Sequence, residues 1–257
     1  MLGFIASIGH AVPDHRPVAR HQLTREGWIA LALRLAEEPG WSLLAEWGER
    51  DRVHACLRED TTGGMAVVSL DCPDLRFPSL GLARPGAWLM ERAIQDLYGL
   101  TAEALPDPRP LLDHDAWPVR LPLSAAPPPP LEAPADYGFL PVEGDGLSEI
   151  PLGPVRGGIA EPAHLRIAAF GETVVRLEAR LGYAHRGIEA LMIGRPMDAA
   201  AALAARIAGD STVAHSIAFA AAVEAATGTE PPPRAVWLRA LMAELERVAN
   251  HLAAIGA

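Results

Sequence analysis

The chain has 257 residues, 50% of them hydrophobic and 21% charged, so it can bury a sizeable core and is not expected to be disordered. The formal net charge of −10 argues against a nucleic-acid-binding protein, which would present basic surfaces. The two cysteines, Cys56 and Cys72, exclude a disulfide framework and any site built from cysteines alone. No apolar stretch reaches the roughly 20 residues of a transmembrane helix, and the N-terminus lacks the basic start of an export signal. We therefore expect a soluble, intracellular protein with no transmembrane segment of its own.

A run of four prolines, Pro127 to Pro130, separates two regions of different composition. Such segments are stiff and extended and contribute little to a core. We predict a first domain over residues 1–125, a proline-rich linker over 126–147 and a second domain over 148–257. The expected fold class is α+β.

The first region mixes helical and strand patterns. Thr24 can cap a helix that carries Trp28. Residues 53–58 and 65–70 have the composition of short strands. A second helix is predicted with Pro85 in its first turn and Gly99 at its end. These elements favour a small α/β sandwich-like domain.

The second region begins with a predicted β-hairpin, because apolar residues alternate on both sides of a turn at Gly171. From about Arg186 onward the sequence is alanine-rich and helical, with one helix starting at Asp210 or Ser211 and ending near Gly228. The last helix carries an apolar stripe with steps of three and four residues. The stripe consists of Leu241, Leu245, Val248, Leu252 and Ile255. Since such a stripe must pack against something, we expect an incomplete helical bundle.

Two clusters have ordinary explanations from their residues alone. Arg92 and Asp96 lie four apart in ERAIQDLYG and can form an exposed ion pair on an amphipathic helix. Glu161 and His164 precede a strand and form a polar loop pair, a weak metal pair or a proton-handling histidine.

Two later clusters lie near predicted helix starts. His185, Arg186 and Glu189 surround Gly187 at a strand-to-helix junction, where they can form a capping network. In RIAGDSTVAHS, residues 206–216, the Asp-Ser-Thr triplet is a good helix N-cap. A Ser/His/Asp nucleophile is disfavoured there, because no glycine pattern of a nucleophile elbow surrounds Ser211.

Read together, these motifs resemble known families. ERAIQDLYG followed by LPDPRPLL (residues 105–112) and DAWP (residues 115–118) resembles the 30 kDa-type subunit of the NADH–quinone oxidoreductase, complex I. That resemblance implies a docking domain without a cofactor. From about residue 148 onward, the GP…EPAHLR, HRGIE, RIAGDSTVAH and ELERVANHL motifs resemble the N-terminal half of a group 4, formate-hydrogenlyase-type NiFe-hydrogenase large subunit and of the 49 kDa-type subunit of complex I.

The departures from these families carry as much information as the matches. In true hydrogenases the fourth motif reads RICGxCxxxH, and its two cysteines hold nickel and iron. Ala208 and Ser211 occupy those positions, and neither replaces a thiolate. The resemblance therefore implies no NiFe centre in this chain and no hydrogen turnover by it. Gly209 stands near the position of a quinone-contacting tyrosine of complex I.

The resemblance also implies roles for the retained residues. Arg206 would face an iron–sulfur cluster of a partner subunit and raise its potential, with His215 lining the same cavity. His185 and Glu189 would lie on a proton path, and His164 is the counterpart of a quinone-contacting histidine.

The resulting hypothesis is an electron-transfer subunit of a membrane-associated, complex I-like or hydrogenase-related oxidoreductase complex, peripheral on the cytoplasmic face of the membrane. It binds no cofactor itself, contacts an iron–sulfur small subunit and antiporter-like membrane subunits, and passes electrons to an acceptor such as a quinone. The alternative is a non-catalytic scaffold or assembly subunit, or a truncated product of such a complex.

Overall fold

The computed structural model describes residues 1–115, 117–124, 138–154 and 162–256. The chain forms two compact units, Met1–Val155 with Pro162–Ala184 and Arg156–Glu161 with His185–Ala257. The predicted α+β class is confirmed, since both sheets and helices are present. The units do not follow the predicted domain ranges, because the hairpin after the proline-rich segment belongs to the first unit. The predicted ranges describe sequence modules and stay a prediction.

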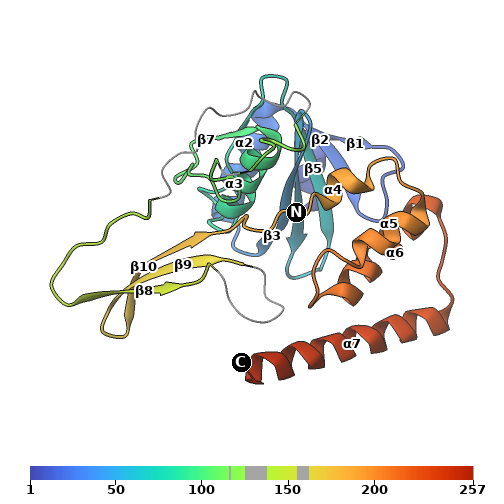
Figure 1. Ribbon diagram of the computed structural model, residues 1–257. Helices are drawn as coiled ribbons and strands as arrows, with labels where there is room; N and C mark the ends of the chain where they lie inside the picture. The colour runs from blue at the N-terminus through green and yellow to red at the C-terminus, as the bar shows by residue number, and fades with distance from the viewer. Residues whose placement is uncertain (116, 125–137, 155–161, 257) are drawn as a thin grey trace. The chain divides into compact units, whose positions relative to one another are not determined.

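A five-stranded sheet lies at the centre of the first unit (Figure 1). Its strands are β1 (Gly9–Val12), β2 (Ala19–Leu23), β3 (Trp41–Glu49), β4 (Arg52–Glu59) and β5 (Met65–Asp71), in the order β1-β2-β5-β4-β3. Only β2 and β5 run parallel. The strands predicted over 53–58 and 65–70 are confirmed as β4 and β5.

Three helices pack against one face of this sheet: α1 (Leu2–Ile8), α2 (Arg25–Glu37) and α3 (Ala87–Tyr98). Alternate residues of β4, beginning with Val53 and Ala55, meet Trp28 of α2 in a fully buried core. The predicted cap of α2 is confirmed, because the Thr24 hydroxyl accepts from the Gly27 amide at 3.1 Å. Two short strands, β6 (Arg76–Pro78) and β7 (Thr101–Glu103), flank α3 and pair in parallel.

The limits of α3 differ slightly from the prediction. Gly86 is the N-cap residue, so Pro85 lies just before the helix and not in its first turn. At the other end Gly99 has φ of 76°, a left-handed conformation that suits glycine and stops the helix as predicted.

The predicted hairpin is part of a three-stranded antiparallel sheet of β8 (Leu147–Leu152), β9 (His164–Phe170) and β10 (Thr173–Arg180), in the order β10-β9-β8. The hairpin of β9 and β10 is confirmed, whereas β8 was not predicted. Pro151 hides β8 in the sequence, since proline is tolerated in a strand only where its missing N–H faces no partner, as on this edge. Ile150, Ile167 and Leu177 align across the three strands and make one face apolar.

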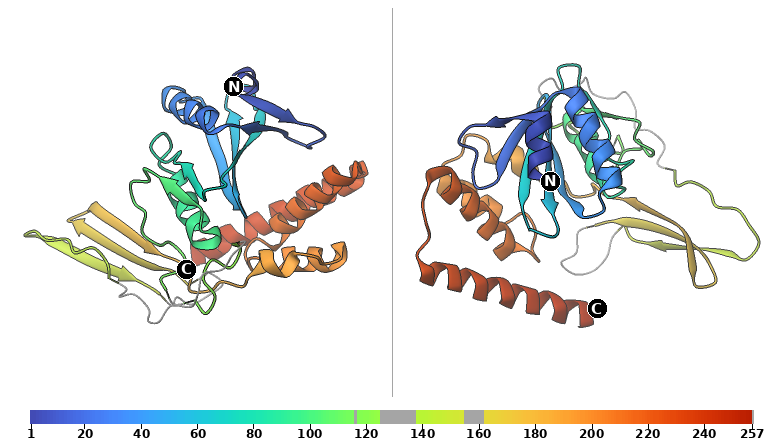
Figure 2. Two further views of the ribbon diagram at one scale, coloured as in Figure 1. Left: turned by 90° about the horizontal axis from the view of Figure 1, so that it is seen from above. Right: turned by 180° about the vertical axis from the view of Figure 1, so that it is seen from behind.

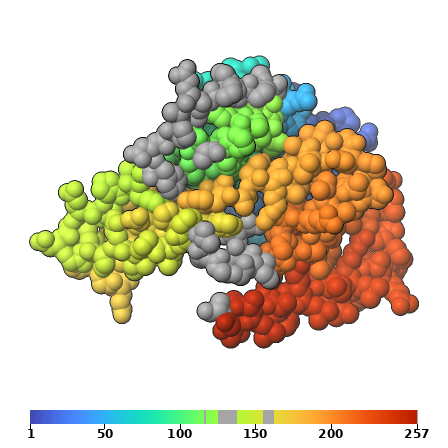
Figure 3. Space-filling view, in the orientation of Figure 1, coloured from blue at the N-terminus to red at the C-terminus, as the bar shows by residue number. Residues whose placement is uncertain are grey.

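The second unit is helical, with α4 (Ile188–Met192), α5 (Met197–Ala204), α6 (Thr212–Thr227) and α7 (Pro233–Gly256). Helix α7 runs beside α6 (Figure 2). The predicted α6 is confirmed and ends at Gly228, whose φ is 67°. The apolar stripe of α7 is exposed, from 51% at Val248 to 83% at Ile255. Figure 3 draws the whole of this helix in red. Among the described residues, no helix combines the length and hydropathy needed to cross a bilayer.

Candidate functional site

The HRGIE motif forms the entry to α4. Gly187 is the N-cap residue in a left-handed conformation, with φ of 64°, and its carbonyl accepts from the Leu191 amide at 2.9 Å. His185 and Glu189 are exposed on either side of this turn. The motif thus starts a helix and presents an imidazole and a carboxylate to solvent.

The RIAGDST segment connects α5 to α6 and contacts the HRGIE turn. The Arg186 guanidinium donates to the Ile207 carbonyl at 3.5 Å, which joins the two motifs within the second unit. Arg206 is exposed, and His215 is half-buried on the first turn of α6. The structure therefore brings the segments of His185, Glu189 and Arg206 together.

The predicted N-cap of α6 is only partly correct. Ser211 occupies the N-cap position, but its hydroxyl contacts the Asp210 carboxylate at 3.1 Å and caps no backbone N–H. The carboxylate of Glu246, on α7, caps the helix instead. It accepts from the Val213 amide at 2.6 Å and from the Ala214 amide at 3.0 Å.

A second side chain of α7 completes this contact. Asn250, one turn after Glu246, donates to the Asp210 carbonyl at 2.7 Å. Glu246 and Asn250 are four residues apart in ELERVANHL, so the sequence indicates that they share a helix face. An apolar groove of about 290 Å³ lies beside the contact. Its lining residues are Thr212, Val213, Ser216, Ile217, Leu238, Arg239 and Met242.

The residues around Ala208 and Ser211 do not fit a nickel–iron centre. The alanine methyl cannot ligate, and a neutral hydroxyl is a poor ligand for soft metals. Within the described ranges, no group of three or more His, Cys, Asp or Glu side chains could hold a metal ion. Cys56 and Cys72 belong to the first unit, and burial raises the pKa of the Cys72 thiol to about 11, which disfavours the thiolate.

His164 is the first residue of β9 and belongs to the first unit, whereas the other candidates belong to the second unit. Its ring meets the Phe139 ring edge-on, with centroids 4.6 Å apart. Partial burial, followed by the charges of Arg166 and Arg180, lowers the pKa of His164. The neutral imidazole is therefore favoured near pH 7. Glu161, its suggested companion, lies outside the described residues.

The expected surface ion pair between Arg92 and Asp96 is wrong. Arg92 is 7% exposed and donates to the carbonyls of Arg109 at 2.6 Å and Pro110 at 2.9 Å. The Asp96 carboxylate accepts from the backbone amides of Leu111 and Leu112, both at 2.7 Å. Both charges instead hold the LPDPRPLL segment against α3, and burial raises the pKa of Asp96.

Glu91, from the same motif, is fully buried. Its carboxylate accepts from the Ser79 hydroxyl at 2.7 Å and from the Leu80 amide at 2.6 Å. Burial raises the pKa of this carboxyl despite these bonds. The charged residues of ERAIQDLYG thus bind backbone groups inside the first unit, and the motif by itself did not predict this burial.

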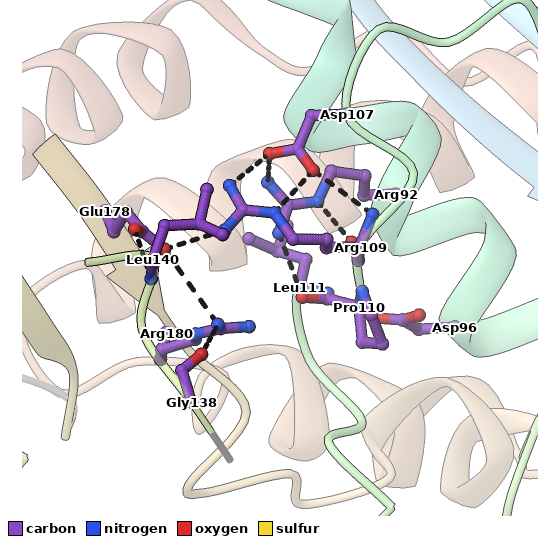
Figure 4. A network of polar contacts seen from close by, with 10 residues as sticks. All are labelled: Arg92, Asp96, Asp107, Arg109, Pro110, Leu111, Gly138, Leu140, Glu178 and Arg180. Atoms are coloured by element: carbon purple, nitrogen blue, oxygen red, sulfur yellow. Dashed lines mark hydrogen bonds and ion pairs between the residues drawn. The ribbon is translucent and has the colours of Figure 1, made fainter. Parts of the chain in front are cut away.

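A further polar network, which the sequence did not predict, joins the LPDPRPLL segment to β10 (Figure 4). Two nitrogens of the Arg109 guanidinium each lie 2.8 Å from a carboxylate oxygen of Asp107. The third nitrogen lies 2.8 Å from the Glu178 carboxylate. The Arg109 guanidinium lowers the pKa of Asp107.

Two family models match the chain in order. Residues 21–129 match the model described as "Respiratory-chain NADH dehydrogenase, 30 Kd subunit", and residues 186–254 match "Nickel-dependent hydrogenase". The chain therefore carries a region similar to the complex I 30 kDa subunit followed by a region similar to nickel-dependent hydrogenases, as the motifs predicted.

Three relatives align with more than two thirds of this chain. Formate hydrogenlyase subunit 5 of Escherichia coli (strain K12) is 35% identical over 74% of this chain, and hydrogenase-4 component G of the same organism is 35% identical over 73%. An NADH-quinone oxidoreductase subunit of Bdellovibrio bacteriovorus is 31% identical over 69% of this chain. The matched regions cover 35%, 35% and 34% of these proteins, so the chain spans about a third of their length.

Proposed function

We propose that this chain acts as an electron-transfer subunit of a membrane-associated oxidoreductase complex related to formate hydrogenlyase and complex I, without a nickel–iron centre at its RIAGDST segment. The order of its two modules supports this assignment, because the same order occurs in relatives named as subunits or components of such enzymes.

One observation carries the proposal: the RIAGDST segment lacks the metal-binding cysteines but presents an exposed arginine. Ala208 and Ser211 remove the ligands, while Arg206 stays exposed at the end of α5. A fixed guanidinium stabilises the reduced form of a nearby cluster and raises its potential. Arg206 would thus act on an iron–sulfur cluster held by a partner subunit.

The remaining parts of the proposal concern partners and acceptor. An iron–sulfur small subunit would contact the second unit, and antiporter-like membrane subunits would hold the complex on the cytoplasmic face of the membrane. The neutral imidazole of His164 suits a hydrogen bond to a quinone, and Glu189 would carry protons.

A pull-down in mild detergent tests the assignment. The natural protein, tagged in its native host, should recover an iron–sulfur subunit and antiporter-like membrane proteins by mass spectrometry. Recovery of the chain alone, or only with chaperones, would contradict it.

A scaffold without a redox role is the second candidate, and the lost thiolates favour it. Arg206→Met in the assembled complex separates the two functions. A lower reduction potential of the partner cluster supports electron transfer, whereas an unchanged potential supports the scaffold.

A further inference from the structure

Asp107 holds the Arg109 side chain in place on its way to Glu178 of the three-stranded sheet. Two parallel hydrogen bonds to Asp107 fix the plane of its guanidinium. The third contact, from Nη1, reaches the Glu178 carboxylate at 2.8 Å. Glu178 is 7% exposed, so water screens this contact little.

Glu178 and its neighbour Arg180 contact the chain around Phe139. The other carboxylate oxygen of Glu178 accepts from the Leu140 amide at 2.9 Å. Arg180 lies 3.9 Å from the same carboxylate and donates to the Gly138 carbonyl at 2.6 Å. Two side chains of β10 therefore hold the backbone on both sides of Phe139 (Figure 4).

His164 contacts both Arg180 and Phe139. Its backbone pairs with Arg180 in the sheet register, and its ring contacts the Phe139 ring. The guanidinium of Arg180 lies 5.3 Å from the centroid of the Phe139 ring, and that of Arg166 lies 4.8 Å from it. The histidine thus faces an aromatic ring whose position depends on Glu178 and Arg180.

We propose that Arg109 is a positioning residue for His164, acting through Glu178, Arg180 and Phe139. The LPDPRPLL segment then orients the imidazole of His164, which lies on a strand that follows the proline-rich segment. The coupling is a property of the first unit by itself. Only the importance of His164 rests on the proposed function.

The charged groups around His164 determine how the coupling can be measured. Arg166 and Arg180 are the cations whose charges lower its pKa. Glu178 offsets Arg180, and Glu149 of β8 offsets Arg166 at 2.7 Å. Burial, and after it the charge of Arg180, also lowers the pKa of His114.

The test is an NMR titration of the histidine rings in the full chain, with the His164 signal assigned by its loss in His164→Gln. Glu178→Gln removes the anion that offsets Arg180, so the His164 midpoint should fall by roughly half a pH unit. Arg109→Met frees Glu178 to offset Arg180 more fully, so the midpoint should rise. General loosening of the fold would move both variants upward, toward the value of a solvated histidine.

The matched control is Glu103→Gln, because Glu103 is a carboxylate of the same unit that is also shared by two arginines, Arg25 and Arg76. It should leave the His164 midpoint unchanged. The proposal is overturned if Glu178→Gln leaves that midpoint unchanged or raises it, or if the control moves it equally. Since the titration needs no partner protein, its failure is distinct from a failure of the pull-down.

Discussion

Helices α3 and α7 both have an amphipathic sequence, yet their side chains end in opposite environments. In α3 the charged residues Glu91 and Arg92 are 0% and 7% exposed. In α7 the apolar residues Leu241 and Leu245 are 55% and 54% exposed. The pattern of polar and apolar residues, read alone, predicted the reverse for both.

The difference lies in what each helix has for a partner. The charges of α3 meet backbone groups of nearby segments, such as the amides of Leu80 and Leu111, so their burial leaves few unpaired groups. Helix α7 contacts α6 through polar side chains such as Glu246, while the residues of its apolar stripe are exposed. Burial is therefore decided by available partners, and four substitutions test this contrast.

The largest effect is expected for Arg92→Met in α3. The variant keeps the bulk but leaves the carbonyls of Arg109 and Pro110 without the Arg92 donor. Unfolding in urea should show a loss of about 3–5 kcal/mol, as for a broken buried charge network. Arg247→Met, on the exposed surface of α7, should change stability by less than about 0.5 kcal/mol. Equal losses in both variants would show that α3 holds no special network.

A smaller, pH-dependent effect is expected for Glu46→Gln under α3. Glu46 of β3 is 5% exposed, and burial, then the charge of Glu91, raises its pKa well above 4.5. The folded state therefore holds a proton that the unfolded state loses, so wild-type stability falls as the pH rises above about 4.5. Glu46→Gln should gain roughly 1–3 kcal/mol over wild type between pH 4 and pH 8. Thermal unfolding at several pH values measures this gain, and a difference independent of pH would refute the titration of Glu46.

A local effect is expected for Glu246→Ala in α7. The variant leaves the amides of Val213 and Ala214 uncapped and should cost about 1 kcal/mol, the usual value of a lost helix cap. Hydrogen exchange should accelerate in the first turn of α6. Glu244→Ala is the matched control. Among the described residues, the exposed Glu244 carboxylate accepts hydrogen bonds from Arg247 alone. Similar exchange in the two variants would remove the capping role.

The smallest effect on folding is expected for Leu245→Ser in the exposed stripe. Because this side chain is already half-exposed, the free energy of unfolding should change by about 0.5 kcal/mol or less. The same variant should reduce partner recovery in the pull-down if the stripe is an interface. A loss of several kcal/mol would mean that the stripe is buried within the folded chain.

Local signals in the sequence predicted much of the fold. Thr24 and Gly99 mark helix limits because capping chemistry is short-range. The alternation over β9 and β10 fixed their pairing around Gly171. Strand β8 escaped prediction because its short pattern contains Pro151, and the pairing that stabilises it comes from residues further along the chain.

The candidate site was less predictable, since its contacts join distant residues. The partners of Arg92 lie 15 to 18 positions away, and Glu178 lies 69 positions from Arg109. The periodicity of a helix or a strand does not indicate contacts between residues so far apart in the sequence. The motifs predicted the resemblance to both families, and the comparisons confirm it. The individual roles of His164, His185, Glu189, Arg206 and His215 stay predictions.

Gly182 packs so closely against the backbone of Leu112 that an added Cβ would lie 1.9 Å from its carbonyl oxygen. Beside it, the Trp117 indole donates to the Gly182 carbonyl at 2.8 Å, and the Leu181 amide donates to the Leu111 carbonyl at 3.2 Å. These contacts join residues on opposite sides of the proline-rich segment. If the chain were divided within that segment, the two pieces would therefore bind each other through these contacts. The covalent connection raises their effective concentration.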